Sequence, residues 1–442
     1  MKKRYALLGL VALATQLAQA QFTLEGEFRP RSEYFGNGGN FTGGSFLAQT
    51  ATNEDEGFVR TTVRAAIKAK YITDSYTVFT SFQEVFAFGD RNQIAAGGNG
   101  NFRVQEAWAD LKLGANSSLK VGRQPLSYDD QRILGGLGWA QQARTHDAAI
   151  FKYAKNGYNL DIGGGLNTTT DEVFNQSALF SYRDMGFLHA NKKYGNFNIS
   201  VLGLVNTFQD NKVLNADLID NSDPDAPIAG IDGIRDTNTY GEDKSTLVTA
   251  GLHAGYKLGG LSLKSNLFLQ EGERLGGNDV KGAFLASLAA GYKMDDKNWV
   301  GLSYEIISGR EDGETAAFFP LYGTNHAFNG YIDRFYVGNH GNAGGLKDLK
   351  LSYKTKLAGL ALTLSGHYFT EHTDIAGNGD KDLGTEIDLV LAKKFKGFKV
   401  VGGYSHFFEP SAVADLPTTK DTQNWAWLML VIKPKFFNSA TK

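Results

Sequence analysis

The connections between candidate strands alternate between short and long, and this alternation constrains the fold more than any other feature of the sequence. Short connections, several of them the Gly or Asn-Gly pairs of tight hairpins, fall at residues 73–74, 115–116, 156–157, 195–196, 259–260, 295–296, 358–359 and 396–397. Long connections lie near residues 35–56, 89–101, 125–145, 167–178, 209–244, 272–281, 309–346, 371–382 and 409–423. Nine long and eight short connections predict eighteen strands, with both chain ends on the short-turn side.

The first candidate strand, residues 22–33, has two faces that suit two different solvents. Phe22, Leu24 and Phe28 share one face, and the other face carries a dense row of acidic and basic side chains, because side chains alternate along a strand. An apolar face against lipid and a charged face in water are typical of a membrane barrel. The sequence therefore predicts an all-β fold: a transmembrane antiparallel β-barrel of about 18 strands with short periplasmic turns and long extracellular loops.

The mean hydropathy of −0.28 does not argue against this fold. In a large barrel only every second strand residue needs to be apolar, so averaged hydropathy understates its contact with lipid. No helical periodicity extends over several turns and no low-complexity linker divides the chain after residue 20. We expect one domain.

The N-terminus has the pattern of a secretory signal peptide. Met-Lys-Lys-Arg is followed by an apolar run from Tyr5 to Ala14 and by Ala18-Gln19-Ala20, a small-residue cleavage site. We predict a signal peptide over residues 1–20, cleavage after Ala20, and an outer-membrane barrel over residues 21–442. The predicted location is the outer membrane of a Gram-negative cell.

Charge and cysteine content exclude several function classes. The signal peptide carries three of the 45 basic residues and none of the 47 acidic ones, which leaves a formal net charge of −5. Without a basic block, nucleic acid is not an expected partner. The chain has no cysteine, so disulfides and Cys-ligated metals are excluded.

The sequence also lacks the common motifs of catalytic sites. The sequence has no Gly-x-Ser-x-Gly, His-Glu-x-x-His or phosphate-binding glycine loop, and its histidines are scattered, so we expect neither an enzyme nor a cofactor. The run Asn221-Ser-Asp223-Pro-Asp225 offers oxygen ligands for calcium but lacks an ordered EF-type spacing, so no metal site is predicted.

Strand parity places basic side chains inside the predicted barrel. In the second strand Val59, Val63 and Ile67 share a face, so Arg60, Arg64 and Lys68 point to the other, the lumen. The same argument turns the following residues inward: Glu106, Asp110, Lys112, Lys120, Lys264, Lys350, Lys354 and Lys356. Inward Arg and Lys lower the barrier for anions, and Arg binds both oxygens of a carboxylate. The alternative is that these charges pair with Glu25, Glu27 and Glu33 and stiffen the wall, above all Arg29 and Arg31.

The connection over residues 125–145 allows two interpretations. It carries Arg132, Trp139 and Arg144, and a Gly135-Gly136 pair gives its backbone freedom to bend. It either folds into the barrel and narrows it, or caps the barrel from outside. We predict the inward fold, with Arg123, Arg132 and Arg144 along the narrowest part of the path.

Several of these residues together resemble the alginate-export family of outer-membrane porins. The resemblance rests on Gly26-Glu-Phe-Arg-Pro-Arg-Ser-Glu33, Glu106-Ala107-Trp108, Gly122-Arg123-Gln124, Arg132, Trp139, Arg144 and Asp147. It is clearest over residues 22–153. It implies an eighteen-stranded barrel that passes an anionic polysaccharide, whose carboxylates contact basic lumen residues.

These arguments lead to one functional prediction with two alternatives. We predict a porin that passes anionic solutes, with a carboxylated oligo- or polysaccharide favoured. A general or phosphate-selective anion porin is the first alternative, and a barrel acting as a surface adhesin or receptor is the second. Expected partners are outer-membrane lipid, the anionic solute, and possible periplasmic export or assembly proteins. The predicted path is lined by Arg29, Arg31, Arg60, Arg64, Lys68, Glu106, Arg123, Arg132, Arg144 and Asp147.

Overall fold

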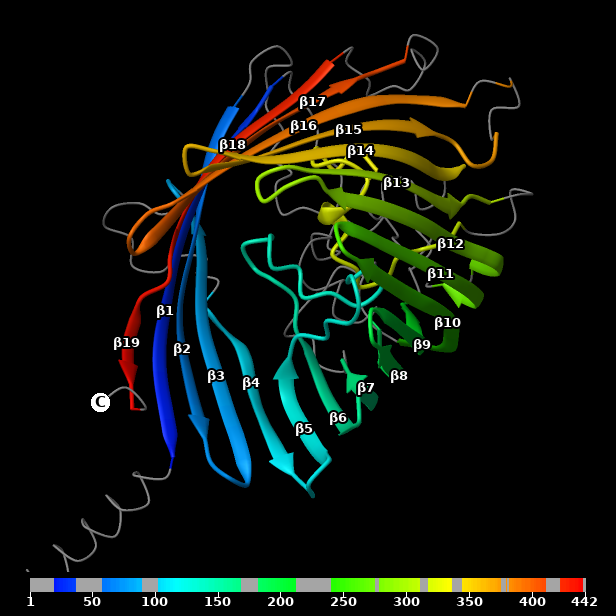
Figure 1. The fold of residues 1–442 in the computed structure, drawn as a ribbon. Helices are drawn as coiled ribbons and strands as arrows, with labels where there is room; N and C mark the ends of the chain where they lie inside the picture. The colour runs from blue at the N-terminus through cyan, green and yellow to red at the C-terminus, as the bar shows by residue number, and fades with distance from the viewer. Residues whose placement is uncertain are drawn as a thin grey trace, which may run out of the picture.

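The described part of the chain forms one antiparallel sheet that closes into a barrel (Figure 1). The computed structural model describes residues 20–36, 58–89, 102–167, 182–211, 240–274, 278–310, 317–335, 344–374, 379, 381–410 and 422–439. The predicted signal peptide and the calcium alternative at residues 221–225 lie outside these residues. No helix among them is long and apolar enough to cross a membrane.

From β1 to β18 each strand pairs with its neighbours in sequence, and β19 pairs with β1. The strands are β1 (Gln21–Phe35), β2 (Phe58–Ile72), β3 (Tyr76–Ala87), β4 (Arg103–Lys112), β5 (Ser117–Gln124), β6 (His146–Lys155), β7 (Tyr158–Leu166), β8 (Asp184–Tyr194), β9 (Phe197–Asn211), β10 (Tyr240–Leu258), β11 (Leu261–Arg274), β12 (Asn278–Lys293), β13 (Trp299–Ser308), β14 (Gly345–Leu357), β15 (Leu360–Thr370), β16 (Asp382–Lys394), β17 (Phe398–Phe408), β18 (Thr422–Ile432) and β19 (Lys435–Asn438). A 3-10 turn, η3 (Asn325–Ala327), lies between β13 and β14.

Closure of the ring depends on β1, which pairs with β2 on one side and with β18 and β19 on the other. β18 and β19 are two parts of one final strand, interrupted at Pro434, which has no N–H to donate. The backbone N–H of Gly26 on β1 donates to the carbonyl of Pro434 at 2.8 Å, so the seam stays bonded across the break. The prediction of an eighteen-stranded closed barrel is confirmed.

The alternation of short and long connections is also confirmed, with two changes. All eight predicted short turns join the strands expected. The long connection predicted over residues 272–281 shrinks to 275–277, because β11 extends to Arg274 and β12 begins at Asn278. The connection predicted over 209–244 is shortened at both ends, since β9 reaches Asn211 and β10 begins at Tyr240.

The two faces of the wall differ as the alternation predicts. Large apolar side chains are exposed on the outer face, among them Ile67, Leu288, Leu302, Leu351 and Leu428. Many charged and amide side chains that point inward are buried instead. This is the arrangement of a barrel with lipid outside and water inside.

Two connections run through the interior of the barrel: residues 125–145, between β5 and β6, and residues 317–335, between β13 and β14 (Figure 1). We call them the first and second inward segments. They touch each other directly, since Gly135 donates its N–H to the carbonyl of Tyr322 at 2.8 Å and Thr324 donates to Gln131 at 2.9 Å. Buried apolar side chains from both segments form a core inside the barrel: Leu126, Ile133, Leu134, Phe318, Leu321, Tyr322 and Ile332.

Candidate solute pathway

The first inward segment is attached to β1 by two arginines. Arg29 donates from Nη1 to the carbonyl of Gly138 at 2.8 Å and from Nη2 to that of Ala140 at 2.9 Å. Arg31 donates to the carbonyl of Trp139 at 3.0 Å, and its guanidinium lies 4.6 Å from the centre of the Trp139 ring. Arg29 and Arg31 are therefore buried attachments of a loop, which neither interpretation expected, although Arg31 also pairs with Glu33 at 2.9 Å as the alternative proposed.

On the opposite wall the same segment is attached through Arg132. The Arg132 side chain is 1% exposed and binds both oxygens of Glu305 on β13, at 3.0 and 2.6 Å. It also donates to the side-chain oxygens of Asn325 at 2.8 Å and Asn329 at 3.0 Å in the second inward segment. The segment thus spans the barrel from β1 to β13. The predicted inward fold is confirmed, and the external-cap alternative is wrong.

A third attachment joins the tip of the segment to β8–β11 through two adjacent carboxylates. Asp129, at a left-handed φ of 53°, accepts a hydrogen bond from Ser200 at 2.6 Å and lies 3.2 Å from His189. Asp130 accepts from Asn266 at 2.7 Å. Burial alone would raise the pKa of Asp129, but the contacts with His189 and Ser200 hold that pKa below its ordinary value.

Aromatic packing fixes the segment near the barrel seam. The Trp139 ring stacks on His326 of the second inward segment at 4.9 Å between centroids and meets Trp427 of β18 edge-on at 4.6 Å. Trp425 lies 6.1 Å away. Hydrogen bonds and ring contacts together hold both segments against the wall.

Most predicted path residues of β2 are already paired. Glu27 on β1 accepts from Lys68 at 2.7 Å and lies 3.6 Å from Arg64, which also donates to Gln83 at 2.7 Å. Arg60 stands opposite Glu33 in the β1–β2 register. Glu106 points inward and accepts from the Trp108 indole at 3.0 Å. Arg64 and Lys68 therefore follow the alternative considered above, in which basic residues pair with acids and stiffen the wall.

Two predicted path residues lie on the wrong face of the wall. Arg123 binds both oxygens of Asp147 on β6, each at 2.7 Å, and both side chains are about half exposed. They share the outer face with Val121, whereas Lys120 and His146 point inward. The prediction that Arg123 and Asp147 line the lumen is therefore wrong. The parity that turned Lys120 inward already required Arg123 to point outward.

Arg144 lies at the junction of the two inward segments. It donates to the carbonyl of Gly323 at 3.2 Å, and its guanidinium lies 5.9 Å from the Tyr322 ring. Of the three arginines predicted along the narrowest path, Arg132 is buried, Arg123 lies outside, and Arg144 holds one segment to the other.

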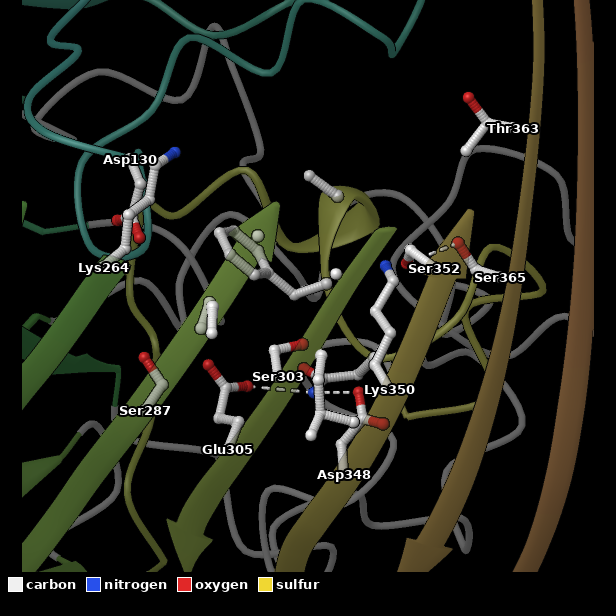
Figure 2. A pocket seen from close by; sticks show the side chains of 18 of the residues that line it. Asp130, Lys264, Ser287, Ser303, Glu305, Asp348, Lys350, Ser352, Thr363 and Ser365 are labelled. Atoms are coloured by element: carbon white, nitrogen blue, oxygen red, sulfur yellow. Dashed lines mark hydrogen bonds between the residues drawn. The ribbon is translucent and has the colours of Figure 1, made fainter. Parts of the chain in front are cut away.

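A cavity of about 520 Å³ lies between the wall strands β11–β16 and the inward segments (Figure 2). We call it the lysine cavity, because Lys264 of β11 and Lys350 and Lys354 of β14 line it. None of the three forms an ion pair with a residue that the structure describes, although the Lys354 ammonium lies 4.6 Å from the Trp299 ring. In Figure 2, Lys264 and Lys350 reach into the space from different walls.

The carboxylates of the lysine cavity are engaged elsewhere. Glu305 is held by Arg132, and Asp348 lies 2.9 Å from His367 Nδ1. The amide of Asn329 donates to both, at 2.9 and 3.2 Å, as the dashed lines in Figure 2 show. Serines complete the lining: Ser262, Ser287, Ser303, Ser352 and Ser365. The cavity therefore offers ammonium groups and hydroxyls to a ligand.

A second cavity of about 680 Å³ lies under β4–β9, on the other side of the segment tip. Its lining is rich in amides and hydroxyls: Ser117, Ser118, Ser127, Tyr128, Asn159, Asn191 and Asn198. Lys152 and Asp161 in its wall pair with each other at 2.6 Å. Asp129 faces this cavity and Asp130 faces the lysine cavity, so the tip of the first inward segment separates the two.

Comparison with known proteins shows the fold. No family model matches the chain, and no curated protein matches it. Among solved structures, the outer membrane protein OpdK from Pseudomonas aeruginosa is 11% identical, with a TM-score of 0.62 over 95% of this chain and 99% of that one. OpdK with vanillate is also 11% identical, with a TM-score of 0.59 over 93% and 99%. OccAB4 of Acinetobacter baumannii is 13% identical, with a TM-score of 0.59 over 94% and 98%. The chain has the closed antiparallel β-barrel fold of these proteins.

Proposed function

We propose that this chain is an outer-membrane channel for small anionic solutes, carboxylates above all. One observation carries the proposal: three ammonium groups, those of Lys264, Lys350 and Lys354, line a cavity in which the carboxylates are already bound by other side chains. An anion that enters meets three ammonium groups that form no ion pair with a residue that the structure describes, and the third carboxylate of the lining, Asp130, accepts from Asn266 at 2.7 Å. Fields in a narrow low-dielectric passage follow local charge, so the net charge of the chain does not decide selectivity.

The chemistry of the lysine cavity suits transient binding. An ammonium is a compact charge on a flexible stem, which attracts an anion without fixing one geometry. Contacts of about 1 to 2 kcal/mol each would lower the entry barrier and still let the solute leave. Serine hydroxyls next to the lysines can accept or donate hydrogen bonds to a hydroxylated carboxylate.

The inward segments favour a small solute over an alginate-like polymer. The two inward segments are bonded to each other and to β1, β8–β11 and β13, and a polymer would have to thread past them. We therefore favour small carboxylates over a polysaccharide. One protein of the same fold was solved with vanillate, a small aromatic carboxylate. The polysaccharide implied by the alginate-export resemblance is the alternative that the experiment below separates.

The test is single-channel recording on the purified barrel in a planar bilayer. Reversal potentials across a salt gradient should show anion preference, and a small carboxylate such as benzoate should produce brief blocks. An acidic oligosaccharide that blocks at lower concentration than benzoate would favour the polymer, and block by phosphate alone would favour a phosphate-like solute. A cation-selective channel, or no channel, would contradict the proposal.

Replacing residues 127–141 with a short glycine linker sharpens the test. This segment crosses the barrel, so its removal should raise conductance and shorten block by benzoate. Unchanged conductance and block in a variant that inserts normally would show that solutes bypass the segment.

A further inference from the structure

The end of the barrel at the short turns has an arrangement of charge that the proposed function does not use. The even-numbered strands run toward these turns, and each from β2 to β16 carries an inward lysine within its last four residues. We define the lysine ring as the members that form no ion pair with a described residue: Lys70, Lys112, Lys193, Lys257, Lys356 and Lys394. The other two, Lys152 and Lys293, form ion pairs with Asp161 and Asp296, each at 2.6 Å. Asp296 also lies close enough to Lys356 for the two charges to interact.

The inward direction of these lysines follows from register and from the cavities. Lys112 lines the second cavity directly, and Lys193 lies two residues beyond Asn191, which lines it too. Lys356 lies two residues beyond Lys354 of the lysine cavity. Residues two apart share a face of a strand. Lys70 follows Lys68 in the same way, and Lys68 reaches inward to Glu27.

The cross-strand neighbours of the ring are neutral or basic. Ser118 stands opposite Lys112, Asn198 opposite Lys193, and Ser262 opposite Lys257. Lys394 stands opposite another lysine, Lys399. Within the described residues none of the six ring lysines forms an ion pair or a hydrogen bond through its ammonium.

The pair of Lys394 and Lys399 opposes stability, because like charges directly across a strand pair destabilise a sheet. Positive charge from many strands also converges on one opening with low-dielectric walls, and such openings raise the local concentration of anions. Ring charges act over about 10 Å at about 0.1 M ionic strength and over about 3 Å at 1 M.

We propose that the lysine ring is a second anion-concentrating element, in series with the lysine cavity and placed at the periplasmic mouth, so that the channel conducts anions unequally in the two directions. The inference rests on the proposed function, because it assumes an open anion path. It adds a dependence of the anion current on its direction, which charges of the lysine cavity in the barrel interior would not produce. Charge fixed at one mouth of a pore makes the ionic current depend on the sign of the voltage.

The test compares two triple substitutions that remove the same charge from the same end of the barrel. The ring variant is Lys112→Gln with Lys193→Gln and Lys257→Gln. The control variant is Lys155→Gln with Lys192→Gln and Lys393→Gln, whose side chains lie on the outward face of β6, β8 and β16. Because the chain has no cysteine, Ser75→Cys in the first short turn reports the orientation of each inserted channel through its reaction with a charged thiol reagent.

The parent should show unequal currents at opposite voltages at about 0.1 M salt and nearly equal currents at about 1 M, where the ring is screened. The ring variant should lose about half of that asymmetry at low salt, and the control variant should keep it. A ring variant of Lys→Arg at the same positions should also keep it, which separates charge from misfolding. Equal loss in ring and control variants, or none in either, would overturn the proposal. Anion preference without asymmetry in the parent would refute the ring alone, whereas loss of anion preference would refute the proposed function.

Discussion

The interior of this barrel contains two kinds of positive charge, and they differ in what surrounds them. One kind is arginine: Arg29 and Arg132 each make several hydrogen bonds to a loop or a carboxylate, and Arg31 donates to the carbonyl of Trp139 and forms an ion pair with Glu33 at 2.9 Å. The other kind is lysine: the members of the lysine cavity and of the lysine ring form no ion pair with a residue that the structure describes. A planar fork of donors suits a fixed backbone or carboxylate, whereas a compact ammonium on a flexible stem suits a mobile ion. In this barrel, therefore, the charges available to a solute are the lysines that form no ion pair, and the arginines hold the inward segments in place.

Among the arginines, loss of the Arg132–Glu305 ion pair should lower the stability of the barrel more than any other change considered below. Arg132→Met leaves Glu305 buried without its charged partner and with only the Asn329 amide as a donor, and removing one member of a buried pair costs about 3 to 5 kcal/mol. Urea unfolding in lipid vesicles, followed by tryptophan fluorescence, should show this loss, and the channel should become noisier as the first inward segment loosens. The double variant with Glu305→Leu should recover most of the stability. A single variant as stable as the parent would mean that Arg132 does not hold the segment.

The next effect compares unpaired lysines with paired basic residues. Lys264→Gln with Lys350→Gln and Lys354→Gln should lower the anion-to-cation permeability ratio several-fold, because these charges act on the solute. The matched triple Arg60→Gln, Arg64→Gln and Lys68→Gln should change it less, because Arg64 and Lys68 are both paired with Glu27, which cancels part of their charge. Reversal potentials across a salt gradient measure both. A larger shift in reversal potential from the second triple would show that Arg60, Arg64 and Lys68, rather than the lysines of the cavity, select the anion.

The fold could be predicted because it depends on patterns that repeat along the chain. Strand parity and alternating connection lengths recur over the whole barrel, so an error at one strand end changes little. The boundaries at Arg274 and Asn278 shifted for this reason without altering the strand count.

The site could be predicted only in part, because it depends on contacts between segments far apart in sequence. That Arg132 meets Glu305, or that Trp139 stacks on His326, follows from how two loops cross the interior, and no spacing in the sequence indicates it. The second inward segment was missed entirely. Its buried run Phe318, Phe319, Leu321 and Tyr322 is an apolar cluster inside a long connection, and that signal was available.

A smaller effect is expected at the tip of the first inward segment, where histidine and hydroxyl contacts replace arginine. Asp129→Asn should cost about 1 kcal/mol near neutral pH, the value of an ordinary hydrogen-bonded contact. Because the pKa of Asp129 is lowered in the folded state, its stabilisation is present above about pH 4 and is lost as pH falls through that lowered pKa. The difference in unfolding free energy between parent and variant should therefore shrink only in strong acid. A difference that disappears already between pH 7 and pH 5 would show that another group controls the contact.

The smallest effect is expected at Arg123. This prediction tests whether the role of a charged side chain depends on its ion pairing and on the face of the wall to which it points, rather than on its residue type. Arg123 is an arginine bound to a carboxylate, like Arg132, but both it and Asp147 are about half exposed on the outer face. Arg123 and Asp147 are each one residue from the strand ends at the long connection, where we expect water rather than lipid. Ion pairs exposed to water contribute about 0 to 1 kcal/mol, so Arg123→Gln should change the unfolding free energy by about 0.5 kcal/mol. The reversal potential and the block by benzoate should stay at the parent values, because this guanidinium does not point into the lumen. A reversal potential that moves as far as in the Lys264, Lys350 and Lys354 triple would place Arg123 on the solute path, and the distinction between inner and outer charge drawn from strand register would then fail.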